Sequence, residues 1–350
     1  MKRLVFLAAL TLALIGGYLY SQDFRPIIFA IVKNSIADLA ASTQRDPGEF
    51  SILFCGTGSP NRTPDRGQPC TALIANGKLF LFDAGEGAIG KLAGARAPTG
   101  VLEAIFLTHL HSDHISGVAE VLHNTWLYGR RAPVRVAGPT GTGDIIKHFN
   151  SAYQLDLTER QRVLGVENID PELAFPVAED IRIPYQGVKE PQLQVVYADG
   201  DLTIGAFLVD HPDWPQAFGY RIQYRDKVVV ISGDTRPSDG VRYFAKGADL
   251  LIHEALNSEV FEYIGEQLEQ QGAPMTQERI ALITHAHTKT DELAQIAEET
   301  GVKNLVITHL IPAMPATWIA DQFFVDGMAD HYAGNISIAR DGQWLDINGL

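Results

Sequence analysis

A short run of histidine and aspartate side chains constrains this chain more than any other feature of its sequence. It reads Thr108-His-Leu-His-Ser-Asp-His114, and it lies between a predicted strand, Ala104–Thr108, and a predicted helix, Ser116–Tyr128. At a turn from strand to helix, His109 and His111 point the same way. The chain then reverses into the helix, which brings the side chains of Asp113 and His114 back toward them. Imidazole and carboxylate ligands suit zinc and neighbouring transition metals. The run therefore predicts a metal site, with a surface histidine cluster as the simplest alternative.

Three later apolar runs also end in polar side chains. Asp210-His211 ends one predicted strand, Asp234 follows Val228–Ser232, and His309 follows Leu305-Val-Ile. In layered α/β folds, the loops at the C-terminal ends of strands gather into one site. We therefore expect His211, Asp234 and His309 to lie beside the first run.

A His-x-His-x-Asp-His run after an apolar strand resembles the signature of the metallo-β-lactamase superfamily, and the later order His, Asp, His matches it. The resemblance implies two divalent ions, Zn²⁺ first, with Mn²⁺ or Fe²⁺ as alternatives. Two such cations lower the pKa of a bridging water, so that hydroxide exists near neutral pH. The implied ligands are His109, His111 and His211 for one ion, Asp113, His114 and His309 for the other, and Asp234 as the bridge.

A narrower resemblance covers roughly residues 50 to 345 and points to the ribonuclease Z-like and arylsulfatase-like branch. Five short segments carry it: Cys55–Pro60, Phe82–Gly87, Phe218–Ile222, Leu251–Ala255 and His287-Thr288. The first of these, a glycine-rich run, is weak evidence alone, because such a run is more often only a tight turn. Together the segments are more specific than any one of them.

This branch also implies catalytic roles. His253 would protonate the leaving group or steady its charge, with Glu254 as the acidic neighbour that sets its pKa. Asp113 would orient the attacking water as well as bind metal, and His287 would support the ligands from outside. The alternative for His253 is a strand-end histidine bonded to backbone.

The order of predicted elements indicates the fold class. Strand-like runs come first in hairpins, one of them turning at Asn76-Gly77, and strands then alternate with helices twice over. Such a pattern predicts two sheets packed together with helices outside. We therefore expect an α/β protein with a four-layer αβ/βα sandwich, the metallo-β-lactamase fold, preceded by an N-terminal signal-anchor helix.

The N-terminus carries features of a targeting segment. Lys2 and Arg3 precede an apolar run, Leu4–Tyr20, which resembles a signal peptide or membrane anchor. We expect this segment in residues 1–24, an amphipathic helix and linker in 25–48, and the hydrolase domain in 49–350. An uncleaved anchor is the first choice, and a cleaved secretory signal or a buried helix are alternatives. The interpretation places the domain on the periplasmic or extracellular side, with the membrane as a partner through the N-terminus.

The chain has two cysteines, Cys55 and Cys70, near the ends of neighbouring predicted strands. A disulfide between them is geometrically reasonable, and so are two buried thiols. The sequence leaves both open, because it does not give the Cα separation that a bridge requires.

Charge and two departures from the branch guide the substrate prediction. The formal net charge is −14. Proteins bind polyanions such as nucleic acids through clusters of Lys and Arg, so this charge argues against a polyanionic partner. The long arm by which bacterial ribonuclease Z holds tRNA is missing after Phe218–Ile222, and Leu310–Pro315 replaces a turn that contains arginine in that family. We therefore expect cleavage of small phosphodiester or sulfate esters, with nucleic acid an unlikely partner and a homodimer left open. The alternatives are a ribonuclease Z-type tRNA 3′-processing endonuclease, a lactone or β-lactam hydrolase, and a non-catalytic metal-binding module.

Overall fold

Two β-sheets face each other and carry the loops that hold the chemistry. The structure is a computed structural model that describes residues 11–12, 15–17, 26–33 and 48–350, apart from 185–189, 213, 215 and 273–275. The chain divides into two units, Met1–Arg45 and Asp46–Leu350, and both sheets belong to the second unit.

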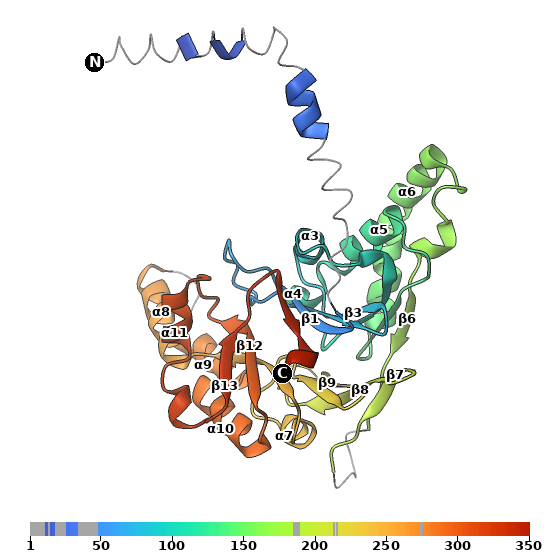
Figure 1. Cartoon of the computed structure of the whole chain (residues 1–350). Helices are drawn as coiled ribbons and strands as arrows, with labels where there is room; N and C mark the ends of the chain where they lie inside the picture. Colours follow the sequence, from blue (N-terminus) through green and yellow to red (C-terminus); the bar gives the residue numbers. More distant parts are fainter. Residues whose placement is uncertain are drawn as a thin grey trace. The chain divides into compact units, whose positions relative to one another are not determined.

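Among the described residues, each sheet has seven strands (Figure 1). The first sheet has the order β14 (Gln343–Asp346), β1 (Phe50–Gly56), β2 (Cys70–Ala75), β3 (Lys78–Phe82), β4 (Leu102–Phe106), β5 (Arg135–Gly138) and β6 (Val177–Asp180). The second has the order β13 (Asn335–Ile338), β12 (Asn304–Ile311), β11 (Leu250–Leu256), β10 (Lys227–Ile231), β9 (Ala217–Tyr224), β8 (Leu202–Val209) and β7 (Gln194–Asp199). Strands β3 to β5 are parallel, as are β10 to β12. The loops of the site follow the C-terminal ends of strands from these two sets and of β8.

Helices cover the outer face of each sheet. The first sheet is covered by α3 (Ala88–Gly94), α5 (Val118–Leu127) and α6 (Thr142–Leu164), and the second by α7 (Asp239–Phe244), α10 (Thr290–Thr300) and α11 (Trp318–Phe324). All seven residues of β1 are buried, because Phe50, Ile52 and Phe54 enter the core between the sheets while Leu53 and Cys55 face the helices. This arrangement confirms the predicted four-layer αβ/βα sandwich.

Two local expectations are resolved at the start of the first sheet. Asn76 and Gly77, between β2 and β3, both have positive φ, 53° and 71°, as a tight two-residue hairpin turn requires. Cys55 and Cys70 form a disulfide across β1 and β2, with their Cα atoms 4.9 Å apart. Of the two alternatives for the cysteines, the structure has the bridge.

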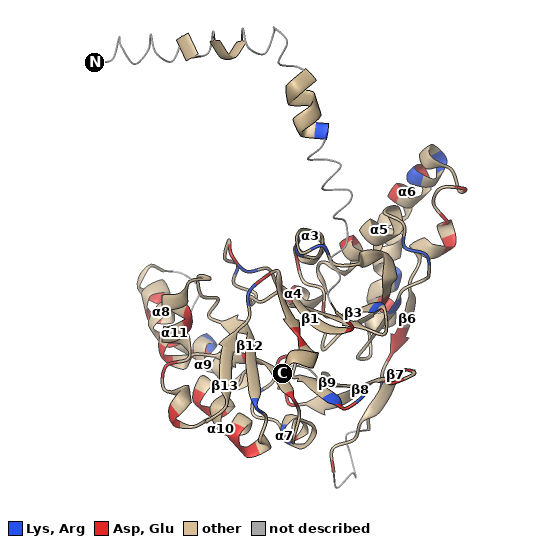
Figure 2. Ribbon diagram, in the orientation of Figure 1, with Lys and Arg blue, Asp and Glu red and all other residues tan. Residues whose placement is uncertain are grey.

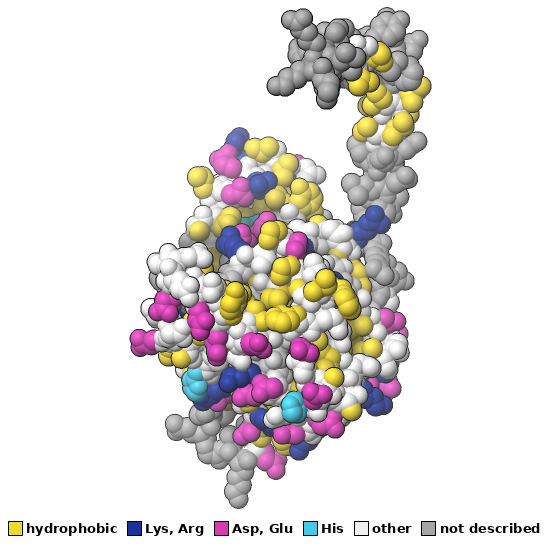
Figure 3. Space-filling view, turned by 90° about the vertical axis from the view of Figure 1, so that its left-hand side faces the viewer, with side chains coloured by type: hydrophobic (Ala, Val, Ile, Leu, Met, Phe, Trp, Pro, Cys, Tyr) yellow, Lys and Arg dark blue, Asp and Glu magenta, His cyan; other side chains and the backbone are white. Residues whose placement is uncertain are grey.

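Several helices differ from the expected pattern. The hairpin of α8 (Ser258–Gln270) and α9 (Gln277–Ala286) was not among the predicted helices. The sequence predicts one helix over Ala316–His331, but the structure has α11 and a short 3₁₀ turn, Met328–Asp330, with Gly327 between them at a φ of 77°. Hydrophobic side chains also gather on the face that carries α8 and α11 (Figure 3): Trp318 is 71% and Ile319 73% exposed. In this region some large apolar side chains are exposed, so the spacing of apolar residues does not identify the buried face of a helix.

The predicted signal-anchor helix is not supported. Most of residues 1–24 lie outside the described residues, and the part of the chain that is described contains no helix long and apolar enough to cross a membrane. Residues 26–33 of the predicted amphipathic helix are helical, with Ile28 and Val32 exposed. The rest of the linker, 34–47, also lies outside the described residues.

Tyr220 ties the second sheet to the strand end that precedes the metal motif. Its side chain is fully buried, its ring lies 5.1 Å from that of Phe82, and its hydroxyl donates to the Leu107 carbonyl at 2.7 Å. We predict that Tyr220→Phe lowers the free energy of unfolding by about 1–3 kcal/mol, because a buried carbonyl loses its partner. Urea unfolding measures this. Tyr263→Phe, at a side chain that is 63% exposed, is the matched control, and an equal loss in both variants would contradict the prediction.

Candidate metal centre

The predicted ligands lie on loops and strand ends that meet at one edge of the two sheets. His109 and His111 follow β4, and Asp113 and His114 lie on the short helix α4 (Ser112–Ile115). His211 follows β8, Asp234 follows β10, and His309 lies within β12. His309 has a φ of 44°, a left-handed conformation uncommon for a non-glycine residue. The pairing of β11 with β12 shifts register beside it, between Glu254 and Ala255.

One group of ligand atoms comes from three histidines. His109 Nε2 lies 2.9 Å from His111 Nδ1, and His211 Nε2 lies 3.4 Å from the same atom. Burial lowers the pKa of His109, His111 and His211. A neutral imidazole keeps a lone pair free for a metal, so this group has the protonation state that binding requires.

A second group lies next to the first. Asp113 Oδ2 is 3.4 Å from both His114 Nε2 and His309 Nε2. Asp234 Oδ2 lies 3.3 Å from His309 Nε2, 3.4 Å from His114 Nε2 and 3.9 Å from His109 Nε2. Asp234 therefore reaches both groups, which is the placement expected of a bridging ligand.

The residues fit a pair of divalent ions. Among the described residues, Asp113 Oδ2, His114 Nε2 and His309 Nε2 are buried without a hydrogen-bond partner, and such atoms are rare unless something else satisfies them. Within each of the two groups, the ligand atoms lie within 4.8 Å of one another. The same holds for a third group, His109, His114 and Asp234, which links them. Imidazole nitrogen and carboxylate oxygen suit zinc, manganese and iron alike, so the donor set does not choose the metal.

Asp83, which sequence reasoning gave no role, holds two of these imidazoles in place. Its carboxylate accepts from His114 Nδ1 at 2.8 Å and from the backbone and hydroxyl of Thr108, each at 2.8 Å. Thr108 Oγ1 in turn lies 3.0 Å from His109 Nδ1. With both Nδ1 atoms engaged, both Nε2 atoms point to the centre. The signal in the sequence is an aspartate directly after β3, within the Phe82–Gly87 segment that carries the family resemblance.

Glu254 and His287 form a buried pair beside the centre. Glu254 is 1% exposed, and its Oε1 accepts from His287 Nδ1 at 3.0 Å and from the backbone of Thr235 and Thr288. His287 lies in a metal-capable group with Asp234 and His309. Burial alone would lower the pKa of His287, but the Glu254 carboxylate outweighs it and raises that pKa to about 9.

His253 is placed differently from the expectation. It belongs to none of the metal-capable groups among the described residues, and its Nδ1 donates to the Glu254 carbonyl at 2.6 Å. Side chains alternate along β11, so His253 shares the helix-covered face with Leu251 and Ala255, and Glu254 lies on the opposite face. The histidine that the structure brings to the centre is His287.

The comparisons with known proteins agree with this geometry. Ribonuclease Z of Mycolicibacterium paratuberculosis is 30% identical over 302 residues, which cover 85% of this chain and 99% of that protein. The fold also matches human tRNase Z, short form, with a TM-score of 0.58 and 22% identity, over 85% of this chain and 99% of that one. A metallo-β-lactamase fold protein from Bacillus subtilis, YhfI, matches with a TM-score of 0.57 and 19% identity, over the same shares.

These relatives overturn two expectations. The prediction that nucleic acid is an unlikely partner is wrong, because the relatives matched along nearly their whole length are ribonucleases by name. It relied on the net charge of the whole chain, whereas bound cations are the largest charges in a site of this kind. The predicted periplasmic or extracellular location, with N-terminal anchoring, is contradicted by the same relatives.

The role of Asp83 is open to a direct test. We predict that Asp83→Asn weakens metal affinity about 10- to 100-fold, because the amide no longer fixes the tautomer of His114. Titration with chelator-buffered zinc, read by elemental analysis, measures this, and wild type should hold two ions per chain if Asp234 bridges. Asp346→Asn, at an exposed carboxylate on β14, is the control. An unchanged metal affinity in Asp83→Asn would contradict the proposal that Asp83 orients the metal-binding imidazoles.

The family model described as "Beta-lactamase superfamily domain" matches residues 78–310, more than half of the chain. Its span includes all the ligand candidates of both groups. The ribonuclease Z-like part of the predicted resemblance is confirmed by the relatives. This chain therefore belongs to the β-lactamase superfamily and is a metal-dependent hydrolase.

Proposed function

We propose that this hydrolase cleaves phosphodiester bonds in RNA, as a ribonuclease Z-type enzyme that processes the 3′ ends of tRNA. The observation that carries the proposal is the match to ribonuclease Z along 99% of that protein's length. The converging donor set of the metal centre supports it. This proposal takes the place of the small-ester substrate expected from charge and missing segments.

Each residue of the centre would have a distinct task in hydrolysis. The histidines and aspartates of the two groups would hold the ions, with Asp234 between them. When bound, two divalent ions supply hydroxide near neutral pH and stabilise charge on the phosphate oxygens. Asp83 fixes the ring orientations of His109 and His114 through the contacts already described. A preorganised centre of this kind needs little rearrangement when charge develops.

We assign the proton donor to His287. Its Nδ1 is bonded to Glu254, so its Nε2 is the atom left to face a substrate. As the phosphorus–oxygen bond breaks, its electron pair goes to the leaving oxygen, which takes the proton from Nε2. Glu254 is a positioning residue, since its Oε1 also holds the backbone of Thr235 and Thr288.

The surface of the chain sets a limit on how RNA would be held. Figure 2 shows acidic side chains along α8, α10 and α11, while basic side chains are scattered. Strands β9 and β10 are joined by a two-residue turn, which agrees with the missing arm. Few phosphates would therefore be neutralised, and affinity should depend on salt less steeply than for a protein with many basic contacts.

The proposal predicts a single cut in precursor tRNA. The metal-loaded protein should release the 3′ trailer of a precursor tRNA at one position, and Asp234→Ala should lose this activity because the link between the two groups is removed. Gel analysis of end-labelled RNA measures both. Asp291→Ala, at an exposed residue on α10, is the matched control. Turnover of small aryl esters without any cleavage of RNA would refute the proposed function.

The proton donor is tested by leaving-group dependence. His287→Asn should lower kcat about 100- to 10,000-fold for RNA, whose leaving oxygen needs a proton. The loss should be much smaller for a nitrophenyl ester, because nitrophenolate leaves without one. His331→Asn, at an exposed histidine, is the control, and His253→Asn tests the role expected from sequence. A leaving-group dependence that appears in His253→Asn and not in His287→Asn would reverse the assignment.

A further inference from the structure

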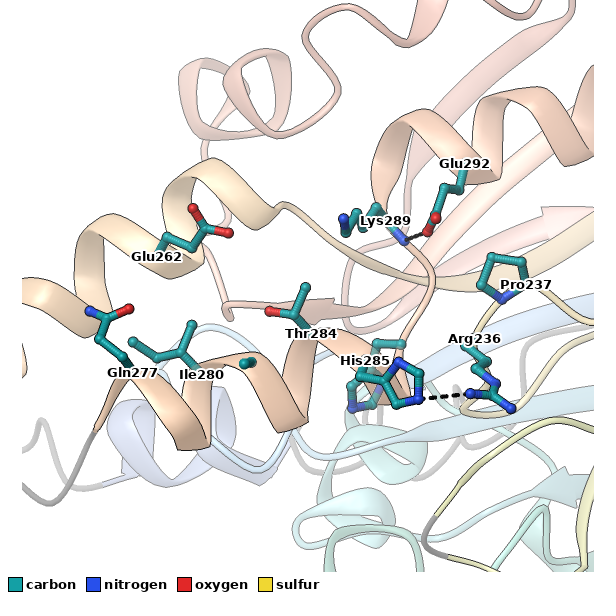
Figure 4. A pocket seen from close by; sticks show the side chains of 11 residues that line it. Arg236, Pro237, Glu262, Gln277, Ile280, Thr284, His285, Lys289 and Glu292 are labelled. Carbon is teal, nitrogen blue, oxygen red and sulfur yellow. Dashed lines mark hydrogen bonds between the residues drawn. The ribbon is translucent and has the colours of Figure 1, made fainter.

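A cavity of about 480 Å³ opens beside the metal centre. One wall is a single face of α9, with Gln277, Ile280, Ala281, Thr284 and His285 at helical spacing. The other walls come from Glu262 of α8, from Lys289 and Glu292 at the start of α10, and from the Arg236-Pro237 turn. In Figure 4, Glu262 and Lys289 lie on different sides of this space, with Thr284 between them on α9. Its volume lies within the range of about 300–1,000 Å³ usual for small-molecule sites.

His287 connects this cavity to the reaction. It lines the cavity, and it also belongs to the metal-capable group with Asp234 and His309. A general acid must touch the leaving oxygen. If His287 donates the proton, the leaving half of the substrate lies on the cavity side of that ring, and the phosphoryl half lies toward the metals.

The polar groups of the cavity are arranged for a ligand with both charge and hydrogen-bonding groups. Lys289 forms no salt bridge among the described residues, and Figure 4 shows its side chain directed away from Glu292, whose carboxylate accepts from the Lys289 backbone. Thr284 Oγ1 is buried without a hydrogen-bond partner among the described residues. Arg236 is already engaged, since it donates to Asp210 and to His285, each at 2.8 Å. Because Arg236 is engaged and His287 is assigned to the leaving oxygen, Lys289 is the described cation of the cavity lining that is left for a phosphate.

We propose that this cavity holds the leaving half of the RNA substrate. The nucleoside whose oxygen takes the proton from His287 lies against α9, where the Thr284 hydroxyl and the Gln277 amide contact its sugar or base. Lys289 binds the next phosphate along that half, and the Glu262 carboxylate accepts from a hydroxyl or amino group. This inference rests on the proposed function. It adds that the leaving half of the substrate binds on the cavity side of His287 and the phosphoryl half binds on the metal side.

The experiment compares Lys289→Met with Lys303→Met, which removes the same charge at an exposed lysine outside the cavity. Two substrates are used: a single-stranded RNA oligonucleotide, and a nitrophenyl ester of a nucleotide, whose leaving group carries no phosphate. For the oligonucleotide, Lys289→Met should raise KM about tenfold, as expected for a lost hydrogen bond to a charged group. For the nitrophenyl ester, KM should stay within about twofold.

Salt dependence separates a phosphate contact from a structural effect. The slope of log kcat/KM for the oligonucleotide against log salt should become shallower by about 0.7 in Lys289→Met, the value for one phosphate of a single strand. It should not change in Lys303→Met. Equal effects of Lys289→Met on both substrates, or an unchanged slope, would overturn the assignment of the cavity. Failure of wild type to cleave any RNA would instead refute the proposed function, so the two failures are distinguishable.

Discussion

The burial of ligand atoms without protein partners is the constraint on which the rest of this structure depends. Asp113 Oδ2, His114 Nε2 and His309 Nε2 are enclosed at one edge of the sheets without a hydrogen bond among the described residues. Polar groups buried in this way cost free energy, and a pair of divalent ions would compensate for it. The packed sandwich holds these atoms within reach of one another, because their loops leave strands that are fixed by the core between the two sheets.

Two buried carboxylates organise the centre from opposite sheets. Asp83 follows β3 of the first sheet and fixes His114 directly and His109 through Thr108. Glu254 lies on β11 of the second sheet and fixes His287 and the backbone near Thr235 and Thr288. One carboxylate therefore orients metal ligands, and the other orients the proposed acid. Glu254 faces the site because its neighbours along β11 point to the other side of the sheet. Asp83 lies just after β3, at a left-handed backbone position with a φ of 60°.

The same scaffold explains how a strongly acidic chain is compatible with an RNA substrate. Net charge describes the whole surface, whereas the proposed contacts lie in a small region between His287 and the α8–α9 hairpin. Metal ions would supply most of the positive charge there, and Lys289 would add one further contact. The absence of an arm after β9 then affects how firmly a large RNA is held more than whether its phosphodiester bond is cleaved.

The sequence by itself determined the fold class and the predicted ligand set, because a dense motif after an apolar strand and the alternation of elements are local signals. The Asn76-Gly77 turn was equally local. Only the tertiary structure shows that His287, and not His253, lies in a metal-capable group, because the two are 34 positions apart along the chain. His253 lies on the helix-covered face of β11, whereas Glu254 accepts a hydrogen bond from His287. The tertiary structure also decided the role of Asp83 and the existence of the cavity. Those features depend on contacts between segments distant in sequence, which no local pattern of residues records.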